Sequence, residues 1–144
     1  MSALPGWLFW SLLSAACAAL TAIFAKLGLE RVDADLATLL RTMVIIVTLA
    51  AFVGLTGKWR NPATLSMRTL GFLGLSGLAT GASWVCYFRA LQLGRASQVA
   101  PVDKLSVLLV ALFAVLFLGE RPAGREWFGI ALVGAGVIVL AWRR

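Results

Sequence analysis

The sequence predicts an all-α membrane protein with five transmembrane helices, and two observations support this prediction. Hydrophobic residues make up 61% of the 144 residues and charged residues only 13%, which is too little polar surface for a water-soluble globule of this size. The apolar residues also form five continuous blocks, each near the roughly 20 residues that a helix needs to cross a bilayer. Because the blocks lack the two-residue alternation of a porin strand, helices are favoured over a β-barrel.

Short polar segments separate these blocks and place the helices. The first block ends before ERVDAD, and the second ends before a loop that contains Gly57 and Asn61-Pro62. Only GRAS separates the third block from the fourth, and ERPAGRE follows the fourth. Trp127 and Trp142 bracket the fifth block, as aromatic residues do at membrane interfaces. We therefore expect one domain over residues 1–144, with helices at about 7–29, 36–56, 70–93, 97–119 and 127–142.

Two of these helices are expected to be interrupted. The second and the fourth keep only fifteen uncharged residues each, at 42–56 and 105–119. Arg41 precedes the first of these runs, and Pro101, Asp103 and Lys104 precede the other. Transporters commonly build midplane binding sites from broken helices, so both segments are candidates for lining an aqueous pathway.

The net charge of +7 comes from basic residues that flank the apolar blocks, which is typical of membrane topology and not of nucleic-acid binding. These connector charges divide evenly, five on the N-terminal face and five on the opposite face. They are Lys58, Arg60, Arg68, Arg121 and Arg125 on the first, and Lys26, Arg31, Arg95, Arg143 and Arg144 on the second. An even balance specifies orientation weakly, so the chain could insert both ways round and form an antiparallel homodimer. If Arg41, Arg89 and Lys104 snorkel to the second face, the count becomes eight against five.

Charged residues inside the apolar blocks are the candidate functional residues, because an unpaired charge in hydrocarbon is costly and normally faces a partner or a watery cavity. Arg89 and Asp103 lie at similar distances from the GRAS connector, so they are expected at similar depth and able to form an ion pair. With Lys26, Arg41 and Lys104 they should share one leaflet and sum to +3. This excess favours an anionic or zwitterionic ligand. Asp103 could instead be a proton-coupling carboxylate, and the long basic side chains could snorkel.

The third helix offers two aromatic candidates. At 100° per residue, Gly77, Thr80, Gly81, Trp84 and Phe88 share one face. Trp84 and Phe88 are expected to form walls of a substrate cavity. The alternative for the small residues is ordinary helix packing, with the Thr80 hydroxyl bonded to its own helix or across to the next.

Enzymatic chemistry is not expected. The chain has no His, and its two cysteines, Cys17 and Cys86, lie inside apolar blocks as small packing residues. With no paired-carboxylate metal motif either, we expect no catalytic residue, no metal and no cofactor.

Two short motifs carry a resemblance to a known family. YFRALQLG at residues 87–94 and LFLGE at residues 116–120, followed by a Gly-rich last helix, resemble one EamA unit of the drug/metabolite transporter superfamily over almost the whole chain. Most such proteins carry two five-helix units with inverted topology around a central cavity. This chain resembles the single-unit members, which would dimerise to make the cavity. Many two-unit members have a proline near the middle of helix four, where this chain reads DKLSVLL, so the resemblance names no substrate.

Together these observations predict a multi-pass transporter of the plasma or inner membrane. We expect it to carry a small anionic or zwitterionic metabolite by alternating access as a dimer, with Arg41, Trp84, Phe88, Arg89, Asp103 and Lys104 as substrate-binding or coupling residues. The alternative is a non-transporting accessory subunit of a membrane complex.

Overall fold

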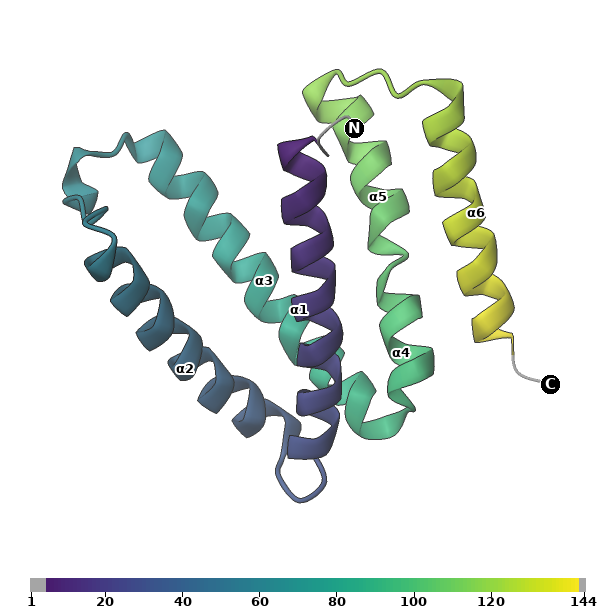
Figure 1. The fold of residues 1–144 in the computed structure, drawn as a ribbon, viewed down its shortest axis with the longest axis horizontal. Coiled ribbons are helices and arrows are strands. Elements are labelled where there is room, and N and C mark those ends of the chain that lie inside the picture. Colours follow the sequence, from purple (N-terminus) through teal and green to yellow (C-terminus); the bar gives the residue numbers. More distant parts are fainter. Residues whose placement is uncertain (1–4, 143–144) are drawn as a thin grey trace. The chain divides into compact units, whose positions relative to one another are not determined.

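The chain is all helical in a computed structural model that describes residues 5–142, and this confirms the expected fold class (Figure 1). Five helical segments in this range are long and apolar enough to cross a membrane: Gly6–Gly28 (α1), Ala34–Leu55 (α2), Met67–Leu93 (α3), Ala96–Leu118 and Gly124–Ala141 (α6). The largest differences from the expected bounds are at two helix starts, where 67 and 124 replace 70 and 127.

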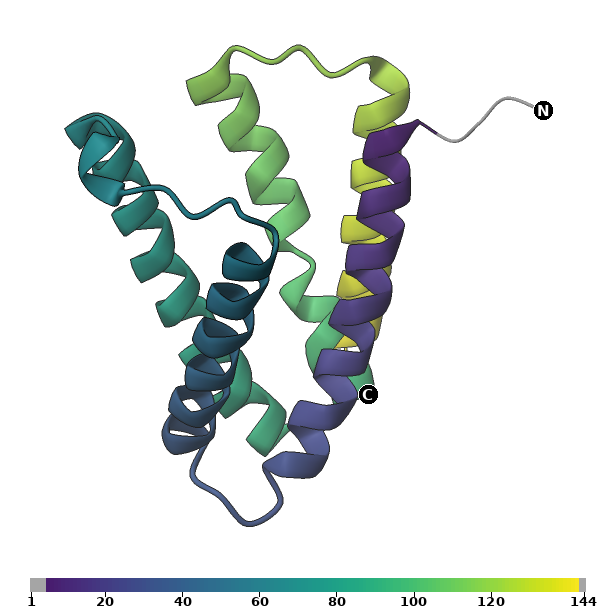
Figure 2. The same cartoon turned by 60° about the vertical axis from the view of Figure 1, so that its left-hand side comes forward.

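The helices form two compact units, which are described separately. One unit is Ile23–Leu93, and the described part of the other comprises residues 5–22 and 94–142. In the first unit, α2 and α3 run antiparallel side by side and are joined by a connector that contains a short 3-10 turn, Pro62–Thr64 (Figure 2). Its buried residues cluster near the start of α2 and the end of α3. They are Leu29, Ala34, Thr38, Phe88 and Leu91.

An aspartate fixes the start of α2. The Asp33 carboxylate accepts hydrogen bonds from the backbone N–H groups of Asp35 (3.0 Å) and Leu36 (3.1 Å). This N-cap satisfies donors that the first turn of a helix otherwise leaves free. The helix therefore begins at Ala34, and Asp35 belongs to its first turn and not to the connector.

The expected interruption of the second helix is wrong, because α2 is continuous from Ala34 to Leu55. This segment contains no proline, and the Thr38 and Thr42 hydroxyls donate to carbonyls one turn back in the same helix. Arg41 does not disturb the backbone, since its side chain lies against aromatic rings of α3. The charge of Arg41 within this apolar block therefore indicates a side-chain contact with α3 and not a break in the helix.

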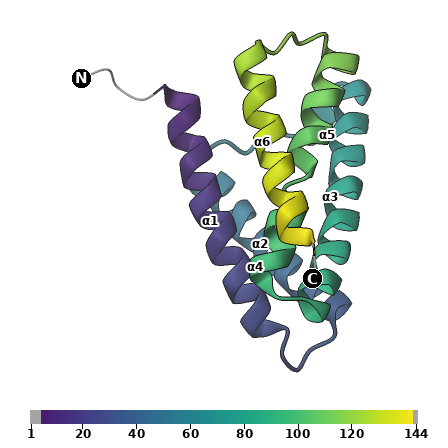
Figure 3. The same cartoon turned by 90° about the vertical axis from the view of Figure 1, so that its right-hand side faces the viewer.

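The expected interruption of the fourth helix is confirmed. It consists of α4 (Ala96–Asp103), α5 (Ser106–Phe113) and a π-helical segment, η2 (Ala114–Leu118) (Figure 3). Between α4 and α5 the bonds tighten to the i→i+3 pattern, with Lys104 N–H donating to the Pro101 carbonyl and Leu105 N–H to the Val102 carbonyl, both at 3.0 Å. Pro101 has no N–H, so it also deprives the Ser97 carbonyl of its helical donor.

The glycine of the LFLGE motif ends this span. Gly119 has φ +70°, a left-handed conformation that costs a side-chain-bearing residue energy and glycine almost nothing. In this conformation the chain turns so that the Glu120 N–H donates to the Ala114 carbonyl at 3.2 Å. The motif therefore has a structural role as a helix C-cap.

Close packing of α5 and α6 depends on a second glycine. A Cβ atom built on Gly134 would lie 2.8 Å from Cδ2 of Leu108. The glycine face of the third helix makes no such close contact. A Cβ on Gly77 or Gly81 would meet nothing within 4 Å in the part of the chain described. The Thr80 hydroxyl bonds within its own helix, to the Ser76 carbonyl at 2.8 Å, which is one of the two expected arrangements.

Candidate substrate-binding site

A cation and two aromatic rings meet between α2 and α3. The guanidinium carbon of Arg41 lies 4.3 Å from the centroid of the Trp84 ring and 5.3 Å from that of the Phe88 ring. Trp84 and Phe88 are four residues apart and therefore lie one above the other on the same face of α3. Three of the six predicted site residues are thus brought together, and we call them the Arg41 cluster.

The Arg41 cluster is only partly covered by the chain. Phe88 is buried, whereas Arg41 and Trp84 are half-buried. A guanidinium over an aromatic face gains about 0.5–1 kcal/mol at an exposed site and about 2 kcal/mol or more when water is excluded. The two rings therefore hold the Arg41 guanidinium in place between the apolar helices α2 and α3.

The Arg41 guanidinium makes no ion pair or hydrogen bond within residues 5–142. Contact with a ring face uses the positive charge but leaves the planar fork of N–H donors unoccupied. This fork matches the geometry of a carboxylate or phosphate group, which it can bind through two parallel hydrogen bonds. The cluster can therefore receive an anionic group from outside the unit.

Arg89 has a different partner from the one expected. Its Nε donates to Oδ1 of Asp35 at 2.9 Å and its Nη2 to Oδ2 at 2.6 Å. The Asp103 carboxylate instead lies 3.4 Å from the Lys104 ammonium. Arg89 finds this partner within its own unit because the N-cap at Asp33 brings Asp35 into α2 at the end where α3 finishes. The expected Arg89–Asp103 pair would join the two units and stays a prediction.

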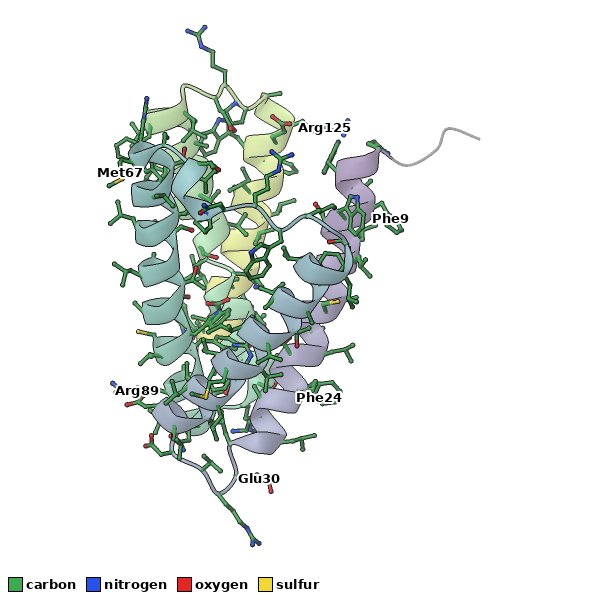
Figure 4. The ribbon with its side chains drawn as sticks, turned by 90° about the vertical axis from the view of Figure 1, so that its left-hand side faces the viewer. Phe9, Phe24, Glu30, Met67, Arg89 and Arg125 are labelled. Carbon is green, nitrogen blue, oxygen red and sulfur yellow. The ribbon has the colours of Figure 1, made fainter. Side chains whose placement is uncertain are left out.

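Two further side chains form hydrogen bonds to backbone carbonyls at the same end of this unit. Lys26 Nζ donates to the Leu91 carbonyl at 2.6 Å, and Gln92 Nε2 donates to the Val32 carbonyl at 2.9 Å. The carbonyls in the last turn of a helix lack intrahelical partners and attract positive charge. Lys26 therefore supplies a donor and a positive charge to the last turn of α3. Figure 4 shows Arg89 toward this end of the unit and Met67 at the opposite end of α3.

This end of the unit was not anticipated from sequence. Asp35 and Gln92 are absent from the predicted site, and Lys26 is predicted there only as a charge of one face and leaflet, without a partner. The sequence did contain a signal for this position of Asp35. An Asp before an apolar run is a common N-cap, and an N-cap at Asp33 places Asp35 in the first turn of the helix. Arg89 and Lys26 are engaged by acceptors, whereas Arg41 and Arg68 contact aromatic rings and have no polar partner among the described residues.

Asp103 and Lys104 belong to the other unit and lie where α4 ends. Both side chains are exposed, and Lys104 forms the cap of α4. Their position at a break in a membrane-spanning helix fits a conformational or coupling role. The Arg41 cluster lies in the first unit, and the predicted role of Asp103 and Lys104 in binding or coupling stays a prediction.

A groove of about 600 Å³ lies between α5 and the start of α6. Apolar side chains of both helices line it together with the charged residues Glu120, Arg121 and Glu126. Glu126 is already engaged, because its Oε2 accepts a hydrogen bond from the Ala123 N–H at 2.6 Å. None of the six predicted site residues lines this groove.

Comparison with known proteins now gives the family. The sequence profile of the EamA-like transporter family matches residues 5–142. The chain belongs to this family. It is therefore a multi-pass membrane transporter, in agreement with the resemblance carried by its two short motifs.

Two kinds of relative agree with this assignment. The chain is 57% identical over 135 residues to a Sinorhizobium sp protein named "Uncharacterized transporter in cobO 3'region", covering 94% of this chain and 96% of that protein. It is 29% identical over 85 residues to the "Probable 4-amino-4-deoxy-L-arabinose-phosphoundecaprenol flippase subunit ArnE" of Yersinia pestis, covering 58% of this chain and 75% of that protein. The same identity and coverage hold for the Yersinia pseudotuberculosis protein of that name. No solved structure matches the chain.

Proposed function

We propose that this EamA-like transporter carries a small metabolite bearing an anionic group, either an anion or a zwitterion, across the plasma or inner membrane. The observation that supports this most strongly is the Arg41 guanidinium, which two aromatic rings hold and which no carboxylate of the described chain neutralises. In the proposal, Arg41 binds the anionic group, and Trp84 and Phe88 form the adjacent wall. Arg89 positions α3 through its ion pair with Asp35.

We also propose that the transporter works by alternating access as an antiparallel homodimer. The support is the single five-helix unit together with the even division of connector charges. Alternating access suits a pair of inverted units around one site. The broken fourth helix, with Asp103 and Lys104 at its break, is the proposed place for coupling of conformational change to a proton or to the substrate.

A thermal-shift measurement tests the ligand class. Detergent-purified protein is titrated with small carboxylates, inorganic phosphate and neutral compounds of similar size. A ligand that binds only the folded state stabilises it by about 2.7 kcal/mol at a concentration 100 times its Kd, so an anion that binds should raise the Tm. Arg41→Ala should lose this response, and Arg41→Lys should keep part of it because the charge remains.

Arg68→Ala is the matched control. Arg68 also lies over an aromatic ring, that of Phe72, but at 5.9 Å and at the start of α3. Its removal should leave the anion response intact. Equal responses from wild type and Arg41→Ala would contradict the proposed role of Arg41.

The second candidate function is an accessory subunit of a membrane complex. The ArnE relatives are named flippase subunits, and this specific observation favours it. Proteoliposomes that contain only this chain distinguish the two functions. Solute movement by the chain alone supports the transporter, whereas no movement together with constant co-purification of one partner supports the subunit.

A further inference from the structure

We infer that Arg41 also sets the charge specificity of the site, because it occupies the position over Trp84 and Phe88 that an organic cation would otherwise take. This inference deepens the proposed function and rests on it for the claim that the Arg41 cluster lies in the substrate's path. It assigns the cluster a second task besides binding an anion, which is the exclusion of cationic compounds.

The geometry is that of an aromatic cation site already filled from within. Aromatic faces bind quaternary ammonium groups when the cation lies within about 6 Å of the ring centroid. The Arg41 guanidinium lies within that range of both rings, at 4.3 Å from Trp84 and 5.3 Å from Phe88. A free organic cation would therefore meet a ring face that is covered and a like charge beside it.

No carboxylate of the described residues pairs with Arg41 to offset that repulsion. The carboxylate of Asp35, which could attract a cation, is taken by the two-point contact with Arg89. Within residues 5–142, no Asp or Glu forms an ion pair with Arg41. The charge next to Trp84 and Phe88 is thus positive without local compensation, and specificity of this kind comes from a repulsive element as much as from an attractive one.

The consequence is that removal of one side chain should reverse the preference. Arg41→Ala uncovers the faces of Trp84 and Phe88 and removes the positive charge, while both rings stay on the same face of α3. An added cation can then occupy the vacated position. A quaternary ammonium is the suitable probe because it has no N–H groups and needs no hydrogen-bond acceptor.

Binding of tetramethylammonium to detergent-purified protein tests this inference. Thermal stability and tryptophan fluorescence are followed during titration with tetramethylammonium chloride, with sodium chloride at equal ionic strength as the reference. Wild type should bind the probe weakly, and Arg41→Ala should bind it about tenfold more tightly, the factor expected from a partly desolvated cation–π contact. The double variant Arg41→Ala/Trp84→Leu should lose this gain because the better ring is gone.

Two controls keep the inference falsifiable. Arg68→Ala, which uncovers the more distant Phe72 ring, should gain no affinity for the probe. Arg41→Gln removes the charge but keeps a polar side chain. It should also gain affinity for the probe, so it replaces Arg41→Ala if that variant fails to fold. Wild-type binding as tight as that of the variants would overturn the inference. A gain that survives loss of Trp84, or no gain in any folded Arg41 variant, would overturn it too.

Failure of this inference can be distinguished from failure of the proposed function. Titration of wild type with acetate and inorganic phosphate measures anion binding in the same assay. Anion binding without a gain of cation binding in the Arg41 variants rejects only the specificity role. A gain of cation binding in the variants, with no anion binding by wild type, rejects the anionic substrate and leaves the aromatic cation position in place.

Discussion

Arg89 and Asp35 form a two-point ion pair, with Nε to Oδ1 at 2.9 Å and Nη2 to Oδ2 at 2.6 Å. The pair joins the first turn of α2 to the end of α3. Both side chains are at least half exposed in the isolated chain, 61% for Arg89 and 50% for Asp35, so in water the contact would contribute little. Near or within a bilayer it gains importance, because the alternative for either charge is contact with an apolar environment.

The first prediction follows from this pair. Arg89→Gln and Asp35→Asn should each lower the Tm of the purified protein, since each leaves one charge without its partner. The double variant should lose less than the sum of the two single losses. A double-mutant cycle on thermal stability measures this coupling.

Asp103→Asn provides the control for the same cycle. Its carboxylate contacts Lys104, and Arg89 contacts Asp35, so its effect should add to that of Arg89→Gln without coupling. Additive effects for Arg89 with Asp35, or coupling of Arg89 with Asp103, would contradict the pairing described here.

The second prediction concerns the helix end at Gly119. Gly119→Ala should destabilise the protein by about 1–2 kcal/mol, because φ +70° is a left-handed conformation that alanine adopts at a cost. Gly129→Ala is the matched control, since Gly129 lies inside α6 with nothing within 4 Å of a built Cβ in the described structure. It should be neutral or stabilising by up to about 1 kcal/mol, because alanine favours a helix more than glycine does. Equal effects of the two substitutions on the Tm would argue against the C-cap role.

The third prediction concerns the packing of α5 on α6. Gly134→Val should lower stability by about 1–3 kcal/mol, the usual cost of overpacking, because even a Cβ at this position would lie 2.8 Å from Leu108. Gly136→Val on the same helix should cost less, since a Cβ there meets nothing within 4 Å among the described residues. Denaturation in detergent compares them, and Leu108→Ala should partly rescue Gly134→Val. A Gly136 variant as unstable as the Gly134 variant would show that valine itself, and not the contact, is responsible.

The fourth prediction concerns orientation in the membrane. After replacement of Cys17 and Cys86 by alanine, single cysteines at Arg31 and at Lys58 report connectors at opposite ends of α2. If the chain inserts both ways round, an impermeant thiol reagent should label each position in about half of the molecules in intact cells. Labelling of one position alone would reject dual orientation and with it the antiparallel homodimer.

Much of the fold could be predicted from the sequence because its signals are local. Apolar blocks separated by polar connectors located all five helices, and Pro101 marked the interruption of the fourth. The same kind of argument failed for the second helix. A charge at Arg41 was interpreted as a backbone break, although a long side chain can satisfy its charge against rings of a neighbouring helix without disturbing its own.

The candidate site could be predicted only in part, because contacts between helices depend on register. Helical periodicity placed Trp84 and Phe88 on one face, but it could not show that Arg41 of α2 lies against them. Comparison of depths suggested Asp103 for Arg89, since it assigned Asp35 to the connector. The N-cap at Asp33 moved the helix start by two residues, from 36 to 34, and this shift was enough to bring Asp35 to Arg89.

Transport by the purified chain tests the central claim most directly. Proteoliposomes are loaded with a mixture of anionic, zwitterionic, neutral and cationic metabolites, and the loss of each compound is followed by mass spectrometry for wild type and for Arg41→Gln. We predict that wild type releases one or more compounds with a carboxylate or phosphate group and retains the organic cations, and that Arg41→Gln, inserted to the same level, releases the anionic compounds far more slowly. Release of cations alone by wild type, or an unchanged rate of anion release by Arg41→Gln, would contradict the account.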